Sequence, residues 1–323
     1  MSMMSELEPE ALPPEPAEPP KRVVGRTPFQ LAWARFKRDK LALVSLVVLV
    51  LMAIFALMAP LWADWTGHPY DQTFPKTALD AAGQPVGPGK DFWLGADQLG
   101  RDVLVRAAYG ARISLVVGIL SALLASLLGV AVGVLSGFVG GVTDTVLARI
   151  MDITLALPYL LVAIMLATTF QISSVTASLT LTILVIAFFS FASFGRIIRG
   201  QVMSLKQKEF IEAARSLGAS NTRIMFVDVL PNLIAQVTVL TSLLIPTSIV
   251  FEATLSFLGV GVRLPMPSWG SMLGEGSDVF QTAWWLLVVP AVLLLLTTLS
   301  FNLLGDGIRD ALDPRSDRII GKK

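Results

Sequence analysis

The sequence lacks cysteine altogether and contains a single histidine, His68. Disulfide frameworks, thiolate metal sites and cysteine nucleophiles are therefore excluded, and a catalytic triad would have only one histidine to draw on. Charge is also scarce, because Asp, Glu, Lys and Arg make up only 15% of the 323 residues. The 25 basic side chains nearly balance the 24 acidic ones, so net charge gives no support for nucleic-acid binding. Most enzyme chemistry is not expected either.

Apolar residues, by contrast, are abundant and occur in long uninterrupted runs. They account for 54% of the chain. A bilayer core about 30 Å thick requires roughly 20 residues of helix, and six stretches reach that length. We therefore expect an all-α, polytopic membrane protein with transmembrane helices near 41–63, 113–138, 148–170, 175–194, 233–258 and 283–304. Pro158, Pro246 and Pro290 fall inside three of these spans and predict kinks there.

Lysine and arginine gather on one side of this predicted topology. Nineteen of the 25 lie before the first span, after the sixth, or in the loops that follow the second and fourth spans. Because cytoplasmic loops retain positive charge, both termini and the loop 196–232 are predicted to be cytoplasmic. The segments 64–112, 171–174 and 259–282 are then external.

Two stretches have the composition of segments that do not fold. Residues 1–20 hold five Glu and six Pro, which argues against a cleaved signal peptide and indicates disorder over 1–27. Residues 76–91 are predicted to be a flexible external insertion for the same reason. We expect a disordered cytoplasmic tail at 1–34 and a first span with its external loop at 35–111. A five-helix core at 112–315, which includes the loop 196–232, and a second cytoplasmic tail at 316–323 follow.

The loop between the fourth and fifth predicted spans has the pattern of helix, turn, helix. Its first helix would place four residues on one face, namely Phe210, Ala213, Ala214 and Leu217. Gly218 suits the left-handed conformation that ends a helix, and Ser220 can cap the next one. Periodicity alone leaves two interpretations open: a helix that rests on lipid headgroups, or a helix that a partner protein contacts.

The spacing within this loop resembles that of a known family. Glu212-Ala-Ala, Gly218 and Leu230-Pro231 match the signature loop of binding-protein-dependent ABC importer permeases, although Asp228 stands where an apolar residue is usual. The resemblance extends from about Arg35 to Arg315. It narrows to the C-type permease subunit of the dipeptide, oligopeptide and nickel importer group through blocks at 94–102, 109–114, 256–261, 267–270 and 302–314.

This resemblance implies a type I ABC importer permease fold in a bacterial or archaeal cytoplasmic membrane. The cytoplasmic helix would be a coupling helix that docks on an ATPase subunit, through Phe210, Glu212, Ala213, Ala214, Arg215, Leu217 and Gly218. Implied partners are a B-type permease subunit in a heterodimer, two ATPase subunits, an external peptide-binding protein and membrane lipid, but no nucleic acid. The implied function is import of dipeptides or oligopeptides driven by ATP.

The chain itself carries no Gly-x4-Gly-Lys-Ser/Thr run, so it cannot hydrolyse ATP by that route. ATP and Mg would therefore be bound by the partner ATPases, and we expect no catalytic residue, cofactor or metal in this chain. Three other interpretations stay open. The chain could be an ion-gradient-driven secondary transporter, a nickel or other solute importer of the same family, or a scaffold that recruits a partner without transport.

A few polar residues near or within the spans are further candidates. Glu252, near the outer end of the fifth span, could line a translocation path or bond a neighbouring helix. Arg101, Asp102 and Trp269 could contact the external binding protein, or could belong to loops that pack on each other. Arg149 and Asp152 are expected to pair with each other. Small residues recur along the second span and predict close helix packing rather than substrate contact, at Ala122, Ala125, Gly129, Gly133 and Gly137.

Overall fold

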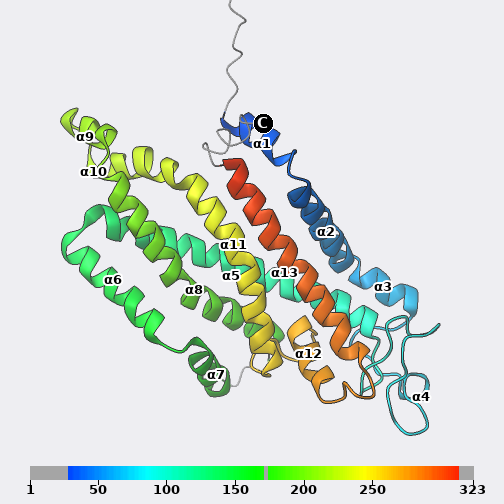
Figure 1. Cartoon of the computed structure of the whole chain (residues 1–323). Helices are drawn as coiled ribbons and strands as arrows, with labels where there is room; N and C mark the ends of the chain where they lie inside the picture. Colours follow the sequence, from blue (N-terminus) through cyan, green and yellow to red (C-terminus); the bar gives the residue numbers. More distant parts are fainter. Residues whose placement is uncertain (1–27, 171–173, 313–323) are drawn as a thin grey trace, which may run out of the picture.

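The computed structural model describes residues 28–170 and 174–312. The predictions for 1–27 and for the tail 316–323 lie outside these residues. Over the described part the chain is almost entirely helical (Figure 1). Its elements are α1 Pro28–Phe36, α2 Lys40–Leu57, α3 Ala59–Thr66, α4 Pro75–Ala78, α5 Val103–Val139, α6 Gly141–Ala156, α7 Tyr159–Thr169, α8 Val175–Leu205, α9 Glu209–Ser216, α10 Asn221–Arg223, the π-helix η1 Ile224–Val229, α11 Leu230–Phe257, α12 Trp269–Ser277 and α13 Trp285–Leu312.

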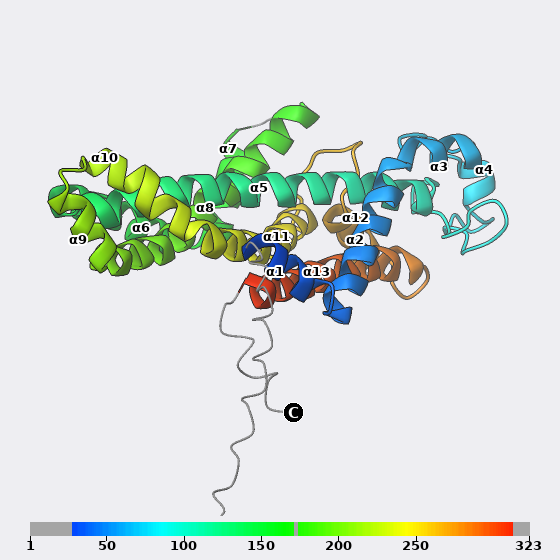
Figure 2. The ribbon, with the colours of Figure 1, turned by 90° about the horizontal axis from the view of Figure 1, so that it is seen from above.

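Within the described residues, five helical stretches are long and apolar enough to cross a membrane. They are α2, α5, α8, the continuous stretch from α10 to α11, and α13, which confirms five of the predicted spans. Asp39 caps α2 and Asp102 caps α5, each by accepting hydrogen bonds from backbone N–H groups of the first turn. Figure 1 shows α2, α13 and α11 side by side, and Figure 2 shows α5 running the length of the bundle.

The third predicted span is a pair of helices rather than one kinked helix. α6 and α7 meet at an angle of 83° around Pro158, which lies at the N-cap of α7. α5 and α8 run parallel, since Gly129 lies against Phe194, Gly133 against Ile198 and Gly137 against Val202. The chain must therefore return across the membrane between them. The bent α6 and α7 pair is that return, which brings the crossings to six.

Several helices extend beyond the apolar stretches that predict them. α5 begins at Val103 because its first turns are buried against other parts of the protein rather than lipid. α8 continues to Leu205, with only Ile198 and Val202 of its last ten residues buried. Residues 28–34, expected to belong to a disordered tail, form most of α1. Its Phe36 is buried in a cluster with Ala311 of α13.

The prediction that 76–91 is a flexible insertion is wrong. The segment begins in α4 and forms a bridge between Leu79 and Pro85. Backbone hydrogen bonds join Val86 to Ala78 and Ala96 to Val86. A small apolar cluster of Ala78, Phe92 and Ala96 lies beneath it. Composition alone did not reveal this order because it depends on Phe92 and Ala96, just outside the segment, and on backbone pairing within it.

Candidate functional site

The loop between α8 and α11 has the helix, turn and helix that its sequence predicts. α9 ends at Ser216, and Gly218 follows in the left-handed conformation with a φ of 82°. The N–H of Gly218 donates to the carbonyl of Arg215 at 2.9 Å. Ser220 accepts a hydrogen bond from the N–H of Arg223 and so caps the next helix. Both local predictions are confirmed.

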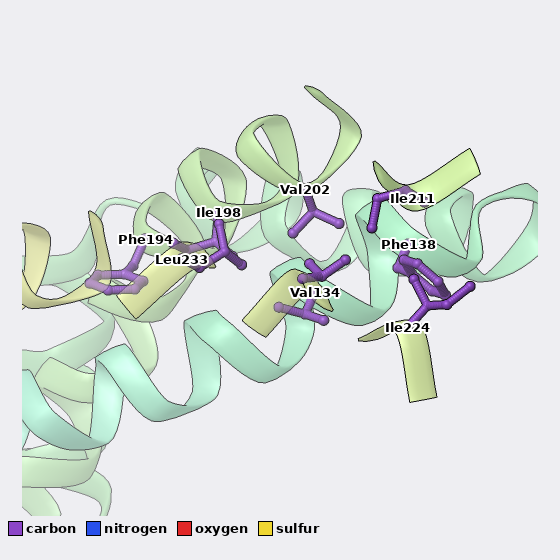
Figure 3. Close-up of a cluster of buried hydrophobic side chains, with 9 residues drawn as sticks. Val134, Phe138, Phe194, Ile198, Val202, Ile211, Ile224 and Leu233 are labelled. Carbon is purple, nitrogen blue, oxygen red and sulfur yellow. The ribbon is translucent and has the colours of Figure 1, made fainter. Parts of the chain in front are cut away.

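α9 is fixed to the bundle by an apolar cluster beneath it. Ile211 and Ile224 are completely buried and join side chains from α5, α8 and α11, as Figure 3 shows. The cluster comprises Val134, Phe138, Phe194, Ile198, Val202, Ile211, Ile224, Val229 and Leu233. Because packed side chains move together, α9 is attached to the ends of three membrane helices rather than suspended from a loop.

Several apolar side chains of this region are exposed, among the exposed polar residues Glu209, Glu212, Arg215 and Ser216. Leu217 is 88% exposed, Phe226 58% and Phe210 44%. Ala213 is exposed as well. The predicted stripe is nevertheless divided, because Ala214 turns partly toward the core beside the buried Ile211. The remaining predicted coupling residues, Glu212, Arg215 and Gly218, are all exposed. In Figure 1, α9 and α10 lie at one end of the molecule and α12 near the other.

The second helix of this region continues into the fifth crossing without a break. η1 carries the chain from α10 into α11, and the N–H of Leu230 donates to the carbonyl of Met225, a π-helical bond. Pro231 follows directly after this π-helical turn, and because it has no N–H it cannot donate a backbone hydrogen bond to the preceding turn. Asp228, the departure from the family pattern, is partly buried, and its backbone carbonyl accepts from Asn232 at 2.6 Å. A displacement of α10 is therefore passed directly to α11.

Ionic contacts join the helix ends next to this site. Asp144 of α6 receives two hydrogen bonds from Arg199 of α8, at 2.6 and 2.7 Å, and one from Ser136 of α5. Lys206 donates to the carbonyl of Phe138 at 2.6 Å. The C-terminal ends of α5 and α8 and the N-terminal end of α6 are thus held together. The predicted pair of Arg149 and Asp152 is looser, at 3.9 Å between exposed side chains, and Asp152 also pairs with Arg196 of α8.

At the opposite end, Glu252 bonds neighbouring helices. Its side chain is completely buried and accepts hydrogen bonds from Ser114 of α5 and Ser256 of α11, each at 2.7 Å. Of the two expected roles, the structure displays the contact with a neighbouring helix. That Glu252 lines a translocation path stays a prediction.

Arg101, Asp102 and Trp269 are also internal. Asp102 is completely buried as the cap of α5, Trp269 donates to the carbonyl of Ala107 at 3.1 Å, and Arg101 pairs with Asp97 at 2.7 Å. The three side chains therefore illustrate the alternative in which external loops pack on each other. Contact with a binding protein stays a prediction, and it would have to involve the surface around these residues.

Sequence reasoning missed an ionic network at this end. Asp97 contacts Arg101 and Arg106, and Glu275 of α12 receives hydrogen bonds from both arginines, at distances from 2.6 to 3.0 Å. Asp97 and both arginines are buried. Asp97 and Arg101 are only four residues apart, but Glu275 is more than 160 residues away from both arginines in the sequence.

Comparisons with known proteins agree with this architecture. Residues 129–318, more than half of the chain, match the family described as binding-protein-dependent transport system inner membrane component. Residues 27–85 match the N-terminal TM domain of oligopeptide transport permease C.

Relatives align over nearly the whole chain. The dipeptide transport system permease protein DppC of Alkalihalophilus pseudofirmus is 37% identical over 94% of this chain and 95% of its own length. The oligopeptide transport system permease protein OppC of Salmonella typhimurium is 42% identical over 91% of this chain and 93% of its own length. The glutathione transport system permease protein GsiD of Salmonella paratyphi A is 41% identical over 90% of this chain and 91% of its own length.

Among solved structures, an inward-facing conformation of the MetNI methionine ABC transporter aligns with a TM-score of 0.53 at 16% identity. The alignment covers 64% of this chain and 96% of that one, so the two share a type I importer permease fold. With the six crossings and the family match together, the chain belongs to the binding-protein-dependent transport system inner membrane components, as a C-type permease subunit.

Proposed function

We propose that the chain is one permease subunit of an ATP-driven peptide importer, and that α9 is the helix through which ATPase subunits move it. The observation that carries this proposal is the dual character of α9. Its outer face exposes Phe210, Ala213 and Leu217, whereas its inner face is packed into the bundle through Ile211. Exposed apolar side chains, flanked by the charged Glu209, Glu212 and Arg215, on an element attached to the bundle give a partner protein a surface through which it can transmit movement.

The proposed mechanism follows the attachments of α9. Two ATPase subunits, which bind ATP and Mg, contact the exposed residues of α9 and displace this helix when they close. The buried cluster passes the displacement to α5 and α8, and η1 passes it to α11. ATP shifts the permease between inward and outward openings only if it binds one arrangement of the ATPases better than the other.

The proposed partners and cargo rest on the relatives. A B-type permease would complete the membrane pore, and an external binding protein would deliver cargo at the end that carries α12. The relatives are named for transport of dipeptides, oligopeptides and glutathione, which are all peptides. Peptides are therefore the proposed cargo, with nickel complexes or other solutes as the alternative. Both termini and α9 would lie in the cytoplasm of a bacterial or archaeal cell.

The test places a negative charge on the exposed side of α9, at Ala213. Ala213→Glu in the complete transporter should abolish peptide uptake while ATP hydrolysis continues, because a carboxylate in an apolar contact must lose its hydration without gaining a partner. Ser204→Glu, at an exposed position of α8, is the matched control and should leave uptake unchanged. Uptake of labelled peptide into proteoliposomes and release of phosphate are measured together. Normal uptake by Ala213→Glu would exclude this role for α9.

The same proteoliposomes separate the alternative functions. Uptake driven by an ion gradient without ATPase subunits would favour a secondary transporter. Binding of the ATPases without any flux would favour a scaffold. Competition between labelled peptide and a nickel chelate identifies the cargo.

A further inference from the structure

A groove lies on the lipid-facing side of the molecule between α2 and α13. Its volume is about 470 Å³, and every side chain that lines it is apolar. Six of the lining residues are Leu51, Met52, Phe55, Leu94, Val288 and Val292. They come from the last two turns of α2, the first two turns of α13 and the external loop. The groove is therefore at the depth of the outer leaflet.

The groove is continuous with a surface that faces lipid. The outer side of α2 exposes Val44, Val47, Leu51 and Ile54 at helical spacing, and Leu51 belongs to both surfaces. Helix contacts inside membranes favour small residues, as at the glycines between α5 and α8. The groove has none of these small residues along its walls. Its composition therefore suits a flexible hydrocarbon chain better than another helix.

A cluster of three tryptophans lies at the outer edge of the groove. The rings of Trp62, Trp65 and Trp93 are 5.8 to 6.5 Å apart, and Trp62 also contacts Phe55 at 6.1 Å. Trp65 is 73% exposed and Trp93 53%. Tryptophan is enriched at the level of lipid headgroups, because its ring is apolar and its N–H is polar.

The course of the chain explains why the cluster forms there. α2 ends at Leu57, and α3, with Pro60 in its first turn, leaves the line of α2 in both views (Figures 1 and 2). Ala59 and Ala63 face the protein, whereas Leu61 and Trp65 face outward. Such a helix, apolar on its outer face, is typical of segments that lie along a membrane interface.

We propose that the groove between α2 and α13 binds an acyl chain of an outer-leaflet phospholipid, whose headgroup lies beside Trp62, Trp65 and Trp93. The apolar walls hold the chain, and the tryptophan cluster fixes the level of the glycerol and headgroup region. The bound lipid fills a gap between the first crossing and the last one, and so holds α2 against the core.

The test uses the complete transporter in vesicles of phosphatidylethanolamine and phosphatidylglycerol. A phosphatidylethanolamine with a photoactivatable diazirine on one acyl chain is added, and labelled residues are mapped by mass spectrometry. Leu51, Val288 and Val292 should be labelled several-fold more than Leu295 and Leu299, which are 62% and 51% exposed on α13 but lie outside the groove. This measurement needs neither cargo nor ATP, so it stands apart from the transport assays.

A matched pair of variants sharpens the test. Val292→Phe fills the groove and should reduce labelling at Leu51 and Val288 several-fold, whereas Leu295→Phe should not. Equal labelling of all exposed residues in the wild type would overturn the proposal, since the lipid would then be ordinary bilayer solvent. A benzophenone side chain at position 292 that cross-links to the second permease subunit would overturn it as well, because a protein would then cover the groove.

Discussion

A carboxyl group enclosed in a membrane protein is stable only if donors surround its oxygens. The carboxylate of Glu252 accepts one hydrogen bond from the hydroxyl of Ser114 in α5 and another from the hydroxyl of Ser256 in its own helix. Ser114 accepts in turn from the backbone N–H of Trp269, the first residue of α12, at 3.3 Å. One buried side chain thereby joins three helices at the end of the molecule opposite α9 (Figure 1).

Loss of this carboxyl group should weaken the fold. Glu252→Ala removes the acceptor of two buried hydroxyl groups and leaves a cavity, so we expect a loss of about 2–4 kcal/mol in stability. Glu252→Gln keeps the volume and one acceptor oxygen and should lose about 1 kcal/mol. The midpoint of thermal unfolding of the purified transporter measures both changes.

A role in the translocation path would give a different result. If Glu252 only joins helices, Glu252→Gln should transport the same range of peptides as the wild type per folded molecule. A changed cargo preference together with an unchanged unfolding midpoint would show that the side chain meets cargo, against our expectation.

Local residue signals were sufficient where the interaction is local. The positions of Gly218 and Ser220 follow from backbone conformation and capping, which depend on neighbours in the sequence. The burial of Trp269 and Arg101 does not, because their partners Ala107 and Glu275 lie far away along the chain. For these candidate docking residues the sequence therefore left two alternatives open, contact with a binding protein or loops that pack on each other, and could not decide between them.

At the scale of helices, the contact between α5 and α8 depends on backbone proximity. A Cβ atom at Gly133 would lie 2.6 Å from the carbonyl oxygen of Gly195 and 2.9 Å from the Cβ of Ile198. A Cβ at Gly137 would lie 2.8 Å from the carbonyl oxygen of Arg199. The predicted packing role of these small residues is confirmed, and the same contact supports the cluster beneath α9.

Gly133→Ala should therefore push α5 and α8 apart. Backbone atoms cannot rotate out of the way as a flexible side chain can, so we expect destabilisation of about 1–3 kcal/mol. Gly200→Ala is the matched control, because nothing lies within 4 Å of its Cβ position. It should be neutral or stabilise α8 by up to about 1 kcal/mol. Similar unfolding midpoints for the two variants would contradict the close contact.

Hydrophobic length predicted that the helices exist but not where they end. α5 starts ten residues before the predicted span, since its first turns are buried by the external loops and need no lipid. The sequence also does not predict the angle between α6 and α7. Pro158 indicates an interruption, but an 83° angle depends on how α7 packs against distant helices such as α11.

At the scale of the whole molecule, two long helices connect the two ends. α5 has 37 residues and is about 55 Å long at 1.5 Å per residue. It begins beside the external network of Asp97, Arg106 and Glu275 and ends beside Asp144 and Lys206. α11 runs from the α9 region to Glu252. Under the proposed function, movement imposed at α9 would reach the loops at the opposite end of the molecule through these two helices, without a separate relay.

This arrangement fixes which residues share a side of the membrane, and labelling can check it directly. The chain has no cysteine, so each single-cysteine variant carries one reactive site in this subunit. A membrane-impermeant maleimide applied to intact cells should label Leu99→Cys, in the external loop, but not Leu217→Cys or Val142→Cys until the membrane is opened. All three positions are more than half exposed, so whether the reagent reaches them depends on the side of the membrane.

Because α5 and α8 are parallel, Val142 and Leu217 must lie on the same side of the membrane and be labelled alike. Opposite labelling of these two positions would mean that α6 and α7 do not complete a crossing, and labelling of Leu217→Cys from outside would remove the proposed contact with the ATPases.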